Sequence, residues 1–378
     1  MSIVGEIREY WRFKKKTPAS DKEIIFYAEH EGYFPYFEGV INELVNKYGK
    51  TVSYITSDIN DPILGEPAPG IRTFYINKLL ALFMAFVECR VFIMTLTDLN
   101  QFHLKRSSNP VHYIYMFHAL VSTHMMYRYG AFDHYDSILC VGPHQLKEIR
   151  KFEEMNNLPP RKLIEAGYYR LERIYKAYKA YSSLKNSSCS EKTILIAPSW
   201  GKDNVLESCG ERLVKLLLGA GHNVIIRPHP ETVRRSPQLI KNFKKLFDDN
   251  SRFTLELSVR TDDSLLEADV LICDCSGVAL EYALGTERPV IFLDVPVKIK
   301  NQRYKELGME PLELTLRSKI GVLVSPEKLE EIPRVISVLI AEREKYRLRL
   351  QELRDKYVYN FGSSSEVGAR FILELLGD

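Results

Sequence analysis

Residues 223–232 read NVIIRPHPET, in which two prolines alternate with an arginine and a histidine. The three β-branched residues near the start predict a buried strand. Proline cannot donate to a sheet ladder, so the strand must end near Arg227. Each proline also favours extended backbone in the residue before it, which leaves no room for a helix and holds Arg227 and His229 on a stiff connection. Because open α/β sheets bind ligands at the carboxyl ends of their strands, the segment predicts a ligand-facing imidazole; a turn that merely contains a histidine is the alternative.

A second strand end with polar residues lies at residues 269–285, DVLICDCSGVALEYALG. A buried strand is expected to end at Asp274, with a helix beginning just after a Ser-Gly pair. The unpaired N–H groups and partial positive charge at the start of that helix suit a phosphate or pyrophosphate. Gly277 lets the backbone come close, Ser276 can donate to a phosphate oxygen, and Glu281, one turn further on, could reach ribose hydroxyls. The alternative is that Ser276 only caps the helix.

The first half of the chain contains a similar segment at residues 111–124, VHYIYMFHALVSTH. A strand of aromatic and β-branched residues is expected to end at His118, whose side chain would face a ligand from the opposite side. An imidazole titrates near neutral pH, so His118 could act as a general base on a hydroxyl group. His112 and His124 compete for this role, although His124 is expected on the following helix.

Several patterns of cofactor and metal chemistry are absent from the sequence. There is no GxGxxG fingerprint and no GxxxxGK[ST] loop, which argues against a nicotinamide dehydrogenase and a P-loop kinase. No HExxH, HxxxH or DxD pattern occurs, and the six cysteines are scattered without a CxxC pair. We therefore expect no cofactor, no protein-held metal and no structural disulfide. Together with the lack of a secretory signal, this composition predicts a reduced, cytoplasmic protein.

The elements that must position these residues follow a βαβ rhythm that occurs twice, which predicts two mostly parallel sheets. The serine-rich, polar residues 182–192, SSLKNSSCSEK, are the expected link between two domains. Strands are expected at residues 23–29, 51–57, 91–96, 111–117, 137–142, 193–200, 223–226, 252–256, 269–274 and 289–294. Helices are expected at residues 36–49, 79–87, 210–222, 236–249, 261–268, 278–285 and 327–356. Two doubly wound α/β domains in tandem would face each other across a cleft, as in the GT-B architecture, which does not by itself define a function.

Charge and hydropathy indicate which classes of binding partner the chain could have. A net charge of +3 over 378 residues argues against a general nucleic-acid binder. The apolar run at residues 79–87 is too short to span a bilayer, which needs about 20 residues. Residues 8–16, REYWRFKKK, mix basic and aromatic side chains and could lie on an anionic membrane surface; an ordinary solvated helix is the alternative.

The strand ends described above carry a resemblance to a known family. The segments ILIAPSW, IIRPHP and ADVLICDCSGVALEYALGTERPVIFLD resemble the carboxyl-terminal domain of the CDP-glycerol glycerophosphotransferases of teichoic acid and capsule polymer synthesis. FHALVST, LIEAGYYRLERI and RDKYVYNFGSSSEVGARFILELL resemble further segments of that family, so the similarity covers most of residues 110–375. The first hundred residues resemble the family only in their alternation of strand-like and helix-like segments. Ala119, Gly277 and Glu281 depart from the family pattern, which has a glycine, a serine and an aspartate there.

The resemblance implies a transferase that moves an alditol phosphate, most simply glycerol phosphate, from a CDP-linked donor to a hydroxyl of a surface-polymer or lipid-linked acceptor, releasing CMP. His118 would be the base, and His229 would steady the donor pyrophosphate. The remaining donor-binding residues would be Pro198, Ser199, Arg227, Ser276, Gly277 and Glu281.

The same resemblance implies a division of labour between domains. Residues 1–181 would form the acceptor-side domain, 182–192 the linker and 193–345 the nucleotide-binding domain, with the helices of 346–378 packing back on the first domain. A cytoplasmic protein, peripheral on the inner face of the membrane, would follow. Two alternatives remain: a GT-B glycosyltransferase that uses a nucleotide sugar, and a non-catalytic nucleotide-binding protein of the same fold.

Overall fold

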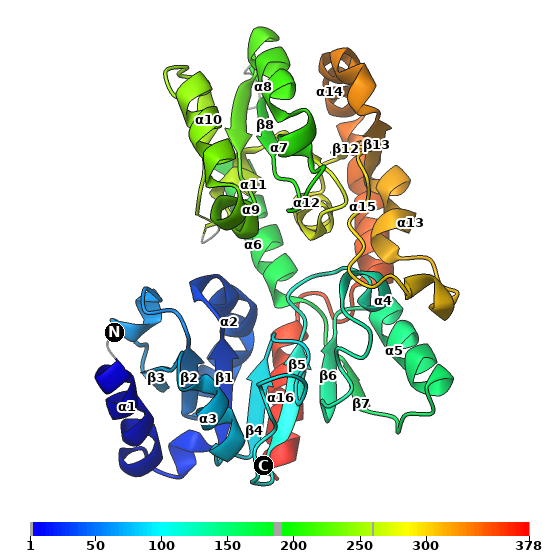
Figure 1. Ribbon diagram of the computed structural model, residues 1–378. Helices are drawn as coiled ribbons and strands as arrows, with labels where there is room; N and C mark the ends of the chain where they lie inside the picture. The colour runs from blue at the N-terminus through cyan, green and yellow to red at the C-terminus, as the bar shows by residue number, and fades with distance from the viewer. Residues whose placement is uncertain (1–2, 185–190, 259–260, 378) are drawn as a thin grey trace.

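Two parallel β-sheets dominate the structure, a computed structural model that describes residues 3–184, 191–258 and 261–377 (Figure 1). The first sheet has the strand order β3-β2-β1-β4-β5-β6-β7, and the second has the order β10-β9-β8-β11-β12-β13. In each sheet the strand that comes first in the chain, β1 or β8, lies inside the sheet. The next two strands follow on one side of it and the remaining strands on the other, which is the doubly wound arrangement. The predicted pair of doubly wound α/β domains is therefore confirmed.

The strands are short, and every pair in both sheets is parallel. The first sheet consists of β1 Ile24–Ala28, β2 Val52–Thr56, β3 Ile71–Tyr75, β4 Val91–Met94, β5 His112–Met116, β6 Ser137–Cys140 and β7 Lys162–Glu165. The second consists of β8 Thr193–Ile196, β9 Asn223–Ile226, β10 Phe253–Leu255, β11 Val270–Cys273, β12 Val290–Leu293 and β13 Gly321–Val324.

Helices cover the sheets and connect the domains. The first domain carries α1 Ile3–Trp11, α2 Phe34–Asn42, α3 Leu80–Phe86, α4 Thr123–Met126 and α5 Pro143–Met155, and α6 Tyr169–Leu184 leaves it. The second carries α7 Val205–Ser208, α8 Gly210–Gly219, α9 Pro230–Arg235, α10 Pro237–Phe247, α11 Asp263–Glu267, α12 Gly277–Thr286, α13 Leu312–Ile320, α14 Ile332–Ala341 and α15 Arg343–Tyr357. The last helix is α16 Ser364–Leu376. Within the described residues, no helix combines the length and apolar character that a membrane crossing needs.

Burial explains which strands the sequence predicts. Every residue of β1, β11 and β12 is buried, because helices cover both faces of a parallel sheet and its inner strands read as continuous apolar runs. The sequence did not predict β3, β7 and β13, and all three are edge strands. Each carries a polar or small residue: Arg72 is exposed in β3, β7 has no buried residue, and β13 begins at Gly321.

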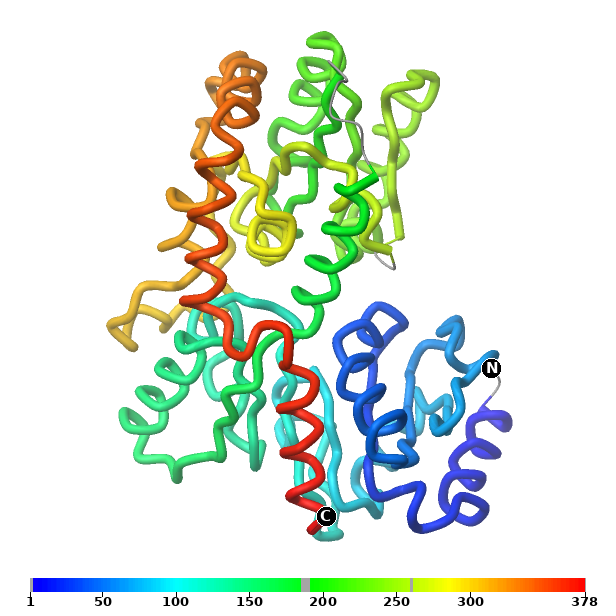
Figure 2. Tube along the Cα trace, turned by 180° about the vertical axis from the view of Figure 1, so that it is seen from behind, coloured from blue at the N-terminus to red at the C-terminus, as the bar shows by residue number. Residues whose placement is uncertain are grey.

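The chain passes between the domains twice, outward through α6 and back from α15 into α16 (Figure 2). Helix α6 packs closely on α12 of the second domain, because a Cβ at Gly285 would lie only 2.7 Å from Cγ2 of Ile174. Helix α15 packs on α12 and α13, whereas α16 packs on α2 of the first domain. The predicted domain limits at residues 181, 192 and 345 stay predictions, and much of the expected linker, residues 185–190, lies outside the described residues.

One local prediction was wrong. The sequence analysis left no room for a helix after Arg227, yet α9 begins at Pro230. Proline suits the first position of a helix, because its fixed φ is already helical and the N–H that it lacks would have no partner there. Strand β5 also ends at Met116, two residues before His118.

Candidate active site

The carboxyl ends of both sheets meet between the domains (Figure 1). In the second sheet the strand order reverses between β8 and β11, so Ser199 and Ser276, which follow these strands, flank the crevice there. In the first sheet it reverses between β1 and β4, and His118 follows β5, the next strand along. Gly277 lies against the loop after His118: a Cβ there would be 3.4 Å from Cγ1 of Val121.

His118 lies in an aromatic surrounding at the end of the first sheet. Its ring centroid is 5.4 Å from that of Tyr33, 6.1 Å from that of Tyr36 and 6.3 Å from that of Tyr127. Within the described residues, its buried Nδ1 has no hydrogen-bond partner. Burial, together with the charge of Lys300, lowers the pKa of His118 to about 4. His118 is therefore neutral at pH 7 and has a free nitrogen that can accept a proton.

His229 lies at the start of α9 and caps it. Its Nδ1 accepts a hydrogen bond from the backbone N–H of Glu231 at 3.0 Å. Because a neutral imidazole has one acceptor and one donor nitrogen, this bond places the proton on Nε2. Burial and the charge of Lys298 lower the pKa of His229 to about 4. His229 is therefore a neutral hydrogen-bond donor whose tautomer is fixed by the helix that it caps.

The two predicted catalytic histidines come from different domains, yet they share one electrostatic environment. The charge of His229 contributes to the lowered pKa of His118. The Trp200 ring lies 6.2 Å from the His229 ring, between centroids. The two imidazoles, one from each domain, therefore lie within electrostatic range of each other.

The Ser276–Gly277 turn leads directly into α12. Ser276 precedes α12, and its side chain makes no capping bond within the described structure. The alternative of a simple cap is thus not what the structure shows, and the hydroxyl stays available to a ligand. The start of α12 lies close to the loop after His118, since a Cβ at Gly277 would be 3.8 Å from that of Ala119, and a helix start carries a partial positive charge.

Asp274 organises the neighbouring strand end, and the sequence analysis gave it no role. Its carboxylate accepts hydrogen bonds from the N–H and the hydroxyl of Ser199, at 2.8 and 3.0 Å. Burial raises the pKa of Asp274. Pro198 precedes this clamp and is buried. Asp274 thereby fixes the predicted donor-binding turn at residues 198–199, and its position directly after an apolar strand is the signal that could have revealed it.

Two predicted donor-binding residues have protein partners. Arg227 is buried, and its Nη1 donates to the Ser264 hydroxyl at 3.1 Å. Glu281 is buried between α12 and α6, where its carboxylate accepts from the Tyr168 hydroxyl at 2.6 Å and from Nε of Arg170 at 3.1 Å. Both carboxylate oxygens of Glu281 thus have protein partners, and its predicted contact with ribose stays a prediction.

A basic segment after β12 was missed by the sequence analysis. The Nζ of Lys298 lies 3.0 Å from the centroid of the Trp200 ring. Burial and the charge of Lys300 lower the pKa of Lys298 to about 8. The backbone N–H of Lys300 donates to the Met125 carbonyl of the first domain at 3.1 Å, so the segment crosses the gap between the domains. Two lysines that follow a strand end at a distance of five and seven residues carry only a weak signal.

The two competing histidines lie elsewhere. His112 begins β5, at the opposite end of the sheet, and its Nε2 bonds to Oγ of Ser137 at 2.7 Å. His124 lies on α4 as predicted, with Nδ1 3.3 Å from Oε2 of Glu148 and Nε2 3.0 Å from the Met309 carbonyl oxygen. Neither ring faces His229, which leaves His118 as the candidate base.

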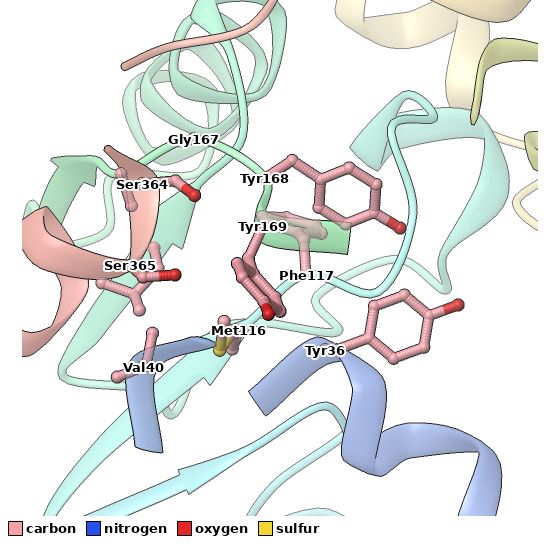
Figure 3. A pocket seen from close by; sticks show the side chains of 11 residues that line it. Tyr36, Val40, Met116, Phe117, Gly167, Tyr168, Tyr169, Ser364 and Ser365 are labelled. Atoms are coloured by element: carbon pink, nitrogen blue, oxygen red, sulfur yellow. The ribbon is translucent and has the colours of Figure 1, made fainter. Parts of the chain in front are cut away.

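A small cavity lies next to Tyr36, one of the aromatic residues around His118 (Figure 3). Ser364 and Ser365 of α16 lie on one side of it and Tyr36 and Tyr168 on the other. It has room for about one water molecule and is therefore not a substrate site. Within the described residues, no group of three or more His, Cys, Asp or Glu side chains is arranged to hold a metal ion.

A sequence model of the family described as CDP-Glycerol:Poly(glycerophosphate) glycerophosphotransferase matches residues 119–305. That range contains His229, Ser276 and Lys298, and it begins one residue after His118. No curated protein matches the sequence.

Solved structures show the same architecture. A histidine-to-asparagine variant of the wall teichoic acid polymerase TagF, soaked with CDPG, has a TM-score of 0.62 and 16% identity over 100% of this chain and 96% of that chain. Another TagF structure has a TM-score of 0.60 at 16% identity, with the same coverage. WaaG, a glycosyltransferase involved in lipopolysaccharide biosynthesis, has a TM-score of 0.51 and 14% identity over 92% of this chain and 99% of that chain. At these identities the similarity shows the fold alone, which is GT-B. Residues 119–305 thus match the CDP-Glycerol:Poly(glycerophosphate) glycerophosphotransferase model, and together with the GT-B fold this match shows that the chain is a transferase.

Proposed function

We propose that this protein transfers glycerol phosphate from CDP-glycerol to a hydroxyl group of a surface-polymer or lipid-linked acceptor and releases CMP. One observation carries the proposal: His118, a neutral imidazole with a free nitrogen, lies within electrostatic range of His229, whose N–H donor is fixed by the α9 cap on the other domain. The matching family model supports the donor class. In this proposal residues 1–181 present the base and the acceptor, and residues 193–345 bind the donor nucleotide.

The reaction cleaves the donor's phosphoanhydride bond. The acceptor oxygen attacks the phosphorus next to glycerol, and a new P–O bond forms while the bond from that phosphorus to the bridging oxygen breaks. His118 takes the acceptor's proton, and CMP leaves with the bridging oxygen and its negative charge. The low pKa of His118 keeps the imidazole unprotonated at neutral pH, so that it can accept this proton.

The donor side supplies the charge stabilisation. His229 donates from Nε2, and the start of α12 at Ser276–Gly277 offers further N–H groups to the phosphate oxygens. Lys298 adds a positive charge close to the same space. These groups are held in place before the substrate arrives by the α9 cap, the Asp274 clamp and the Trp200 ring. Preorganised donors of this kind stabilise developing charge without reorganisation during the reaction.

The amino-terminal helix supports a membrane contact. Helix α1 leaves Ile3, Val4, Ile7 and Trp11 between 43 and 71% exposed. The aromatic residue Phe13, by contrast, is buried, so most of the apolar surface lies before the predicted segment 8–16, which adds only Trp11 to it. The π-helical turn that follows α1 ends with three lysines in succession. We propose that these apolar side chains enter the interface of an anionic membrane, beside the basic turn, and so bring the protein to a lipid-linked acceptor.

Labelled CDP-glycerol tests the reaction. The label is placed on the phosphorus next to glycerol, and membrane lipids are supplied as acceptor. We expect label in the lipid fraction and unlabelled CMP in solution, with no transfer by His118→Ala and unchanged binding of CMP to that variant.

Two results would replace the proposal. If CDP-glycerol is inert while a nucleotide sugar gives a glycan linked without phosphate, the protein is a glycosyltransferase. If nucleotides bind but neither donor reacts, the chain is a nucleotide-binding protein of the same fold.

A further inference from the structure

His30 lies at the position in the first sheet that corresponds to the donor site of the second. It follows β1, next to the point between β1 and β4 where the strand order reverses. Ligands of open α/β sheets bind in the crevice at such a point. In the second sheet the equivalent connection, after β8, carries Ser199 and Trp200. A strand end in this position with a half-buried histidine is therefore a candidate for substrate contact.

The local geometry of His30 repeats that of His229. Its Nδ1 accepts a hydrogen bond from the backbone N–H of Gly32 at 3.1 Å, as a cap of the short helix Glu31–Tyr33. The corresponding bond of His229 is 3.0 Å long. In both rings the proton is thereby placed on Nε2, the nitrogen that points away from the backbone. Within the described residues, no hydrogen bond occupies Nε2 of His30, so this donor is free.

The surroundings place His30 beside both catalytic histidines. Its ring is 4.4 Å from that of Tyr33, which is 5.4 Å from that of His118. The charge of His30 contributes to the lowered pKa of His118 and to that of His229. Glu231, which follows His229 on the second domain, acts in turn on the pKa of His30. One side chain of the first domain thus lies within electrostatic range of the base and of the donor-binding helix.

We propose that His30 is a second imidazole donor to the transferred phosphoryl group, with its Nε2–H bonded to a non-bridging oxygen on the side opposite to His229. The proposal rests on the proposed phosphotransfer and adds a residue to it. Two neutral donors, one from each domain, would hold the distal phosphorus between them, and His118 would face the incoming hydroxyl. The site is then complete only when both domains contribute, which ties catalysis to their relative position.

Two substitutions separate the donor from the cap. Asparagine at position 30 can place its side-chain oxygen where Nδ1 accepts, so His30→Asn keeps the cap and removes the outer donor. Glutamine can place an amide N–H where Nε2 lies, so His30→Gln removes the cap and keeps a donor. His103, an exposed histidine of the first domain, provides the matched control as His103→Asn.

Binding and turnover are measured for all four proteins. We expect His30→Asn to lower kcat by about 10²-fold or more, the usual loss for one oxyanion-type donor. Its affinity for CDP should fall by about tenfold or more while its affinity for CMP stays unchanged, because only CDP carries the distal phosphate. His30→Gln should retain most of the turnover and most of the affinity for CDP, and His103→Asn should match the wild type in both measurements.

The opposite ranking of the two His30 variants in activity would overturn the inference. If His30→Gln loses activity while His30→Asn keeps it, His30 serves only as a helix cap. Equal losses of CDP and CMP affinity in His30→Asn would also contradict it, because the distal phosphate would not be the group bound. The CDP-to-CMP comparison needs no turnover, so it remains decisive even if wild-type protein fails to use CDP-glycerol and the proposed function falls.

Discussion

At the scale of single residues, the site depends on imidazoles that stay neutral. A histidine pKa of about 4 means that His118 is unprotonated throughout the range in which most histidines titrate. Its protonated form is disfavoured by burial and by the neighbouring positive charges, so the base becomes unavailable only as the pH falls through about 4. The same surroundings make His118 a weaker base than an ordinary histidine, so its availability at neutral pH is gained at the expense of driving force for proton transfer.

The pH dependence of kcat/KM tests whether these imidazoles stay neutral. We expect the value to stay nearly constant between pH 7 and pH 5.5, since His118 and His229 are both neutral there. On the alkaline side it should fall above pH 8, where Lys298, whose pKa is about 8, loses its charge. Lys298→Arg should remove the alkaline limb, because a guanidinium keeps its charge. A loss of about fivefold between pH 6.5 and 5.5 would show that the base titrates as an ordinary histidine, whose pKa is about 6.5.

Strand-end chemistry predicted His118, His229 and the Ser276 turn, because a polar residue after an apolar run is visible in the sequence. Lys298 and His30 were not found. Lys298 reaches the site through a long connection, and His30 depends on which strand occupies the reversal point of the first sheet. That order is set by packing between segments far apart in the chain, and the sequence pattern alone does not define it.

At the scale of elements, the inner strands were predicted, whereas of the four edge strands only β10 was. β1, β11 and β12 are apolar on both faces, whereas β3, β7 and β13 have one neighbour and tolerate polar or small residues. Helix α9 was missed for another reason. Proline ends a strand, and it also suits the first position of a helix. The sequence pattern at Pro230 is compatible with both, and in the structure Pro230 begins α9.

The close packing of α6 on α12 gives a prediction at this scale. Gly285→Ala should lower the free energy of unfolding by about 1–3 kcal/mol, the usual cost of overpacking, since its Cβ would collide with Ile174. Gly219→Ala, at the end of α8, is the control, because a Cβ there meets nothing within 4 Å. Alanine should be neutral or stabilising by up to about 1 kcal/mol at that position. Urea unfolding measures both. Equal stability changes in the two variants would show that α6 and α12 are not in tight contact.

At the scale of the whole molecule, one end of the first domain is proposed to face a membrane. Ile3→Ser combined with Val4→Ser removes apolar surface that is 49 and 71% exposed and should leave the core unchanged. We expect this double variant to sediment with anionic vesicles several-fold less than the wild type. Removal of residues 1–17 is a poorer test, because Glu6 is buried and accepts from the N–H groups of Asn77 and Leu79, at 2.6 and 2.7 Å.

The matched control exchanges exposed apolar residues on another part of the surface. Leu246→Ser lies on α10 of the second domain, where the side chain is 49% exposed. It should not change sedimentation with vesicles. Equal recovery of all three proteins would remove α1 as a membrane contact and leave the source of the acceptor open.

The return of the chain through α16 has a consequence for synthesis. Ala369 and Ile372 of this last helix belong to the same apolar cluster as Phe26 and Phe37, which are among the first core residues to be made. A chain that emerges from the ribosome amino end first therefore cannot complete the cover on this face of its first sheet until α16 has been translated. The second domain, whose strands lie between residues 193 and 324, can assemble in the meantime. The domain that begins first is thus the one that is finished last, and during that interval its apolar face is the part of the chain most exposed to aggregation or to chaperones.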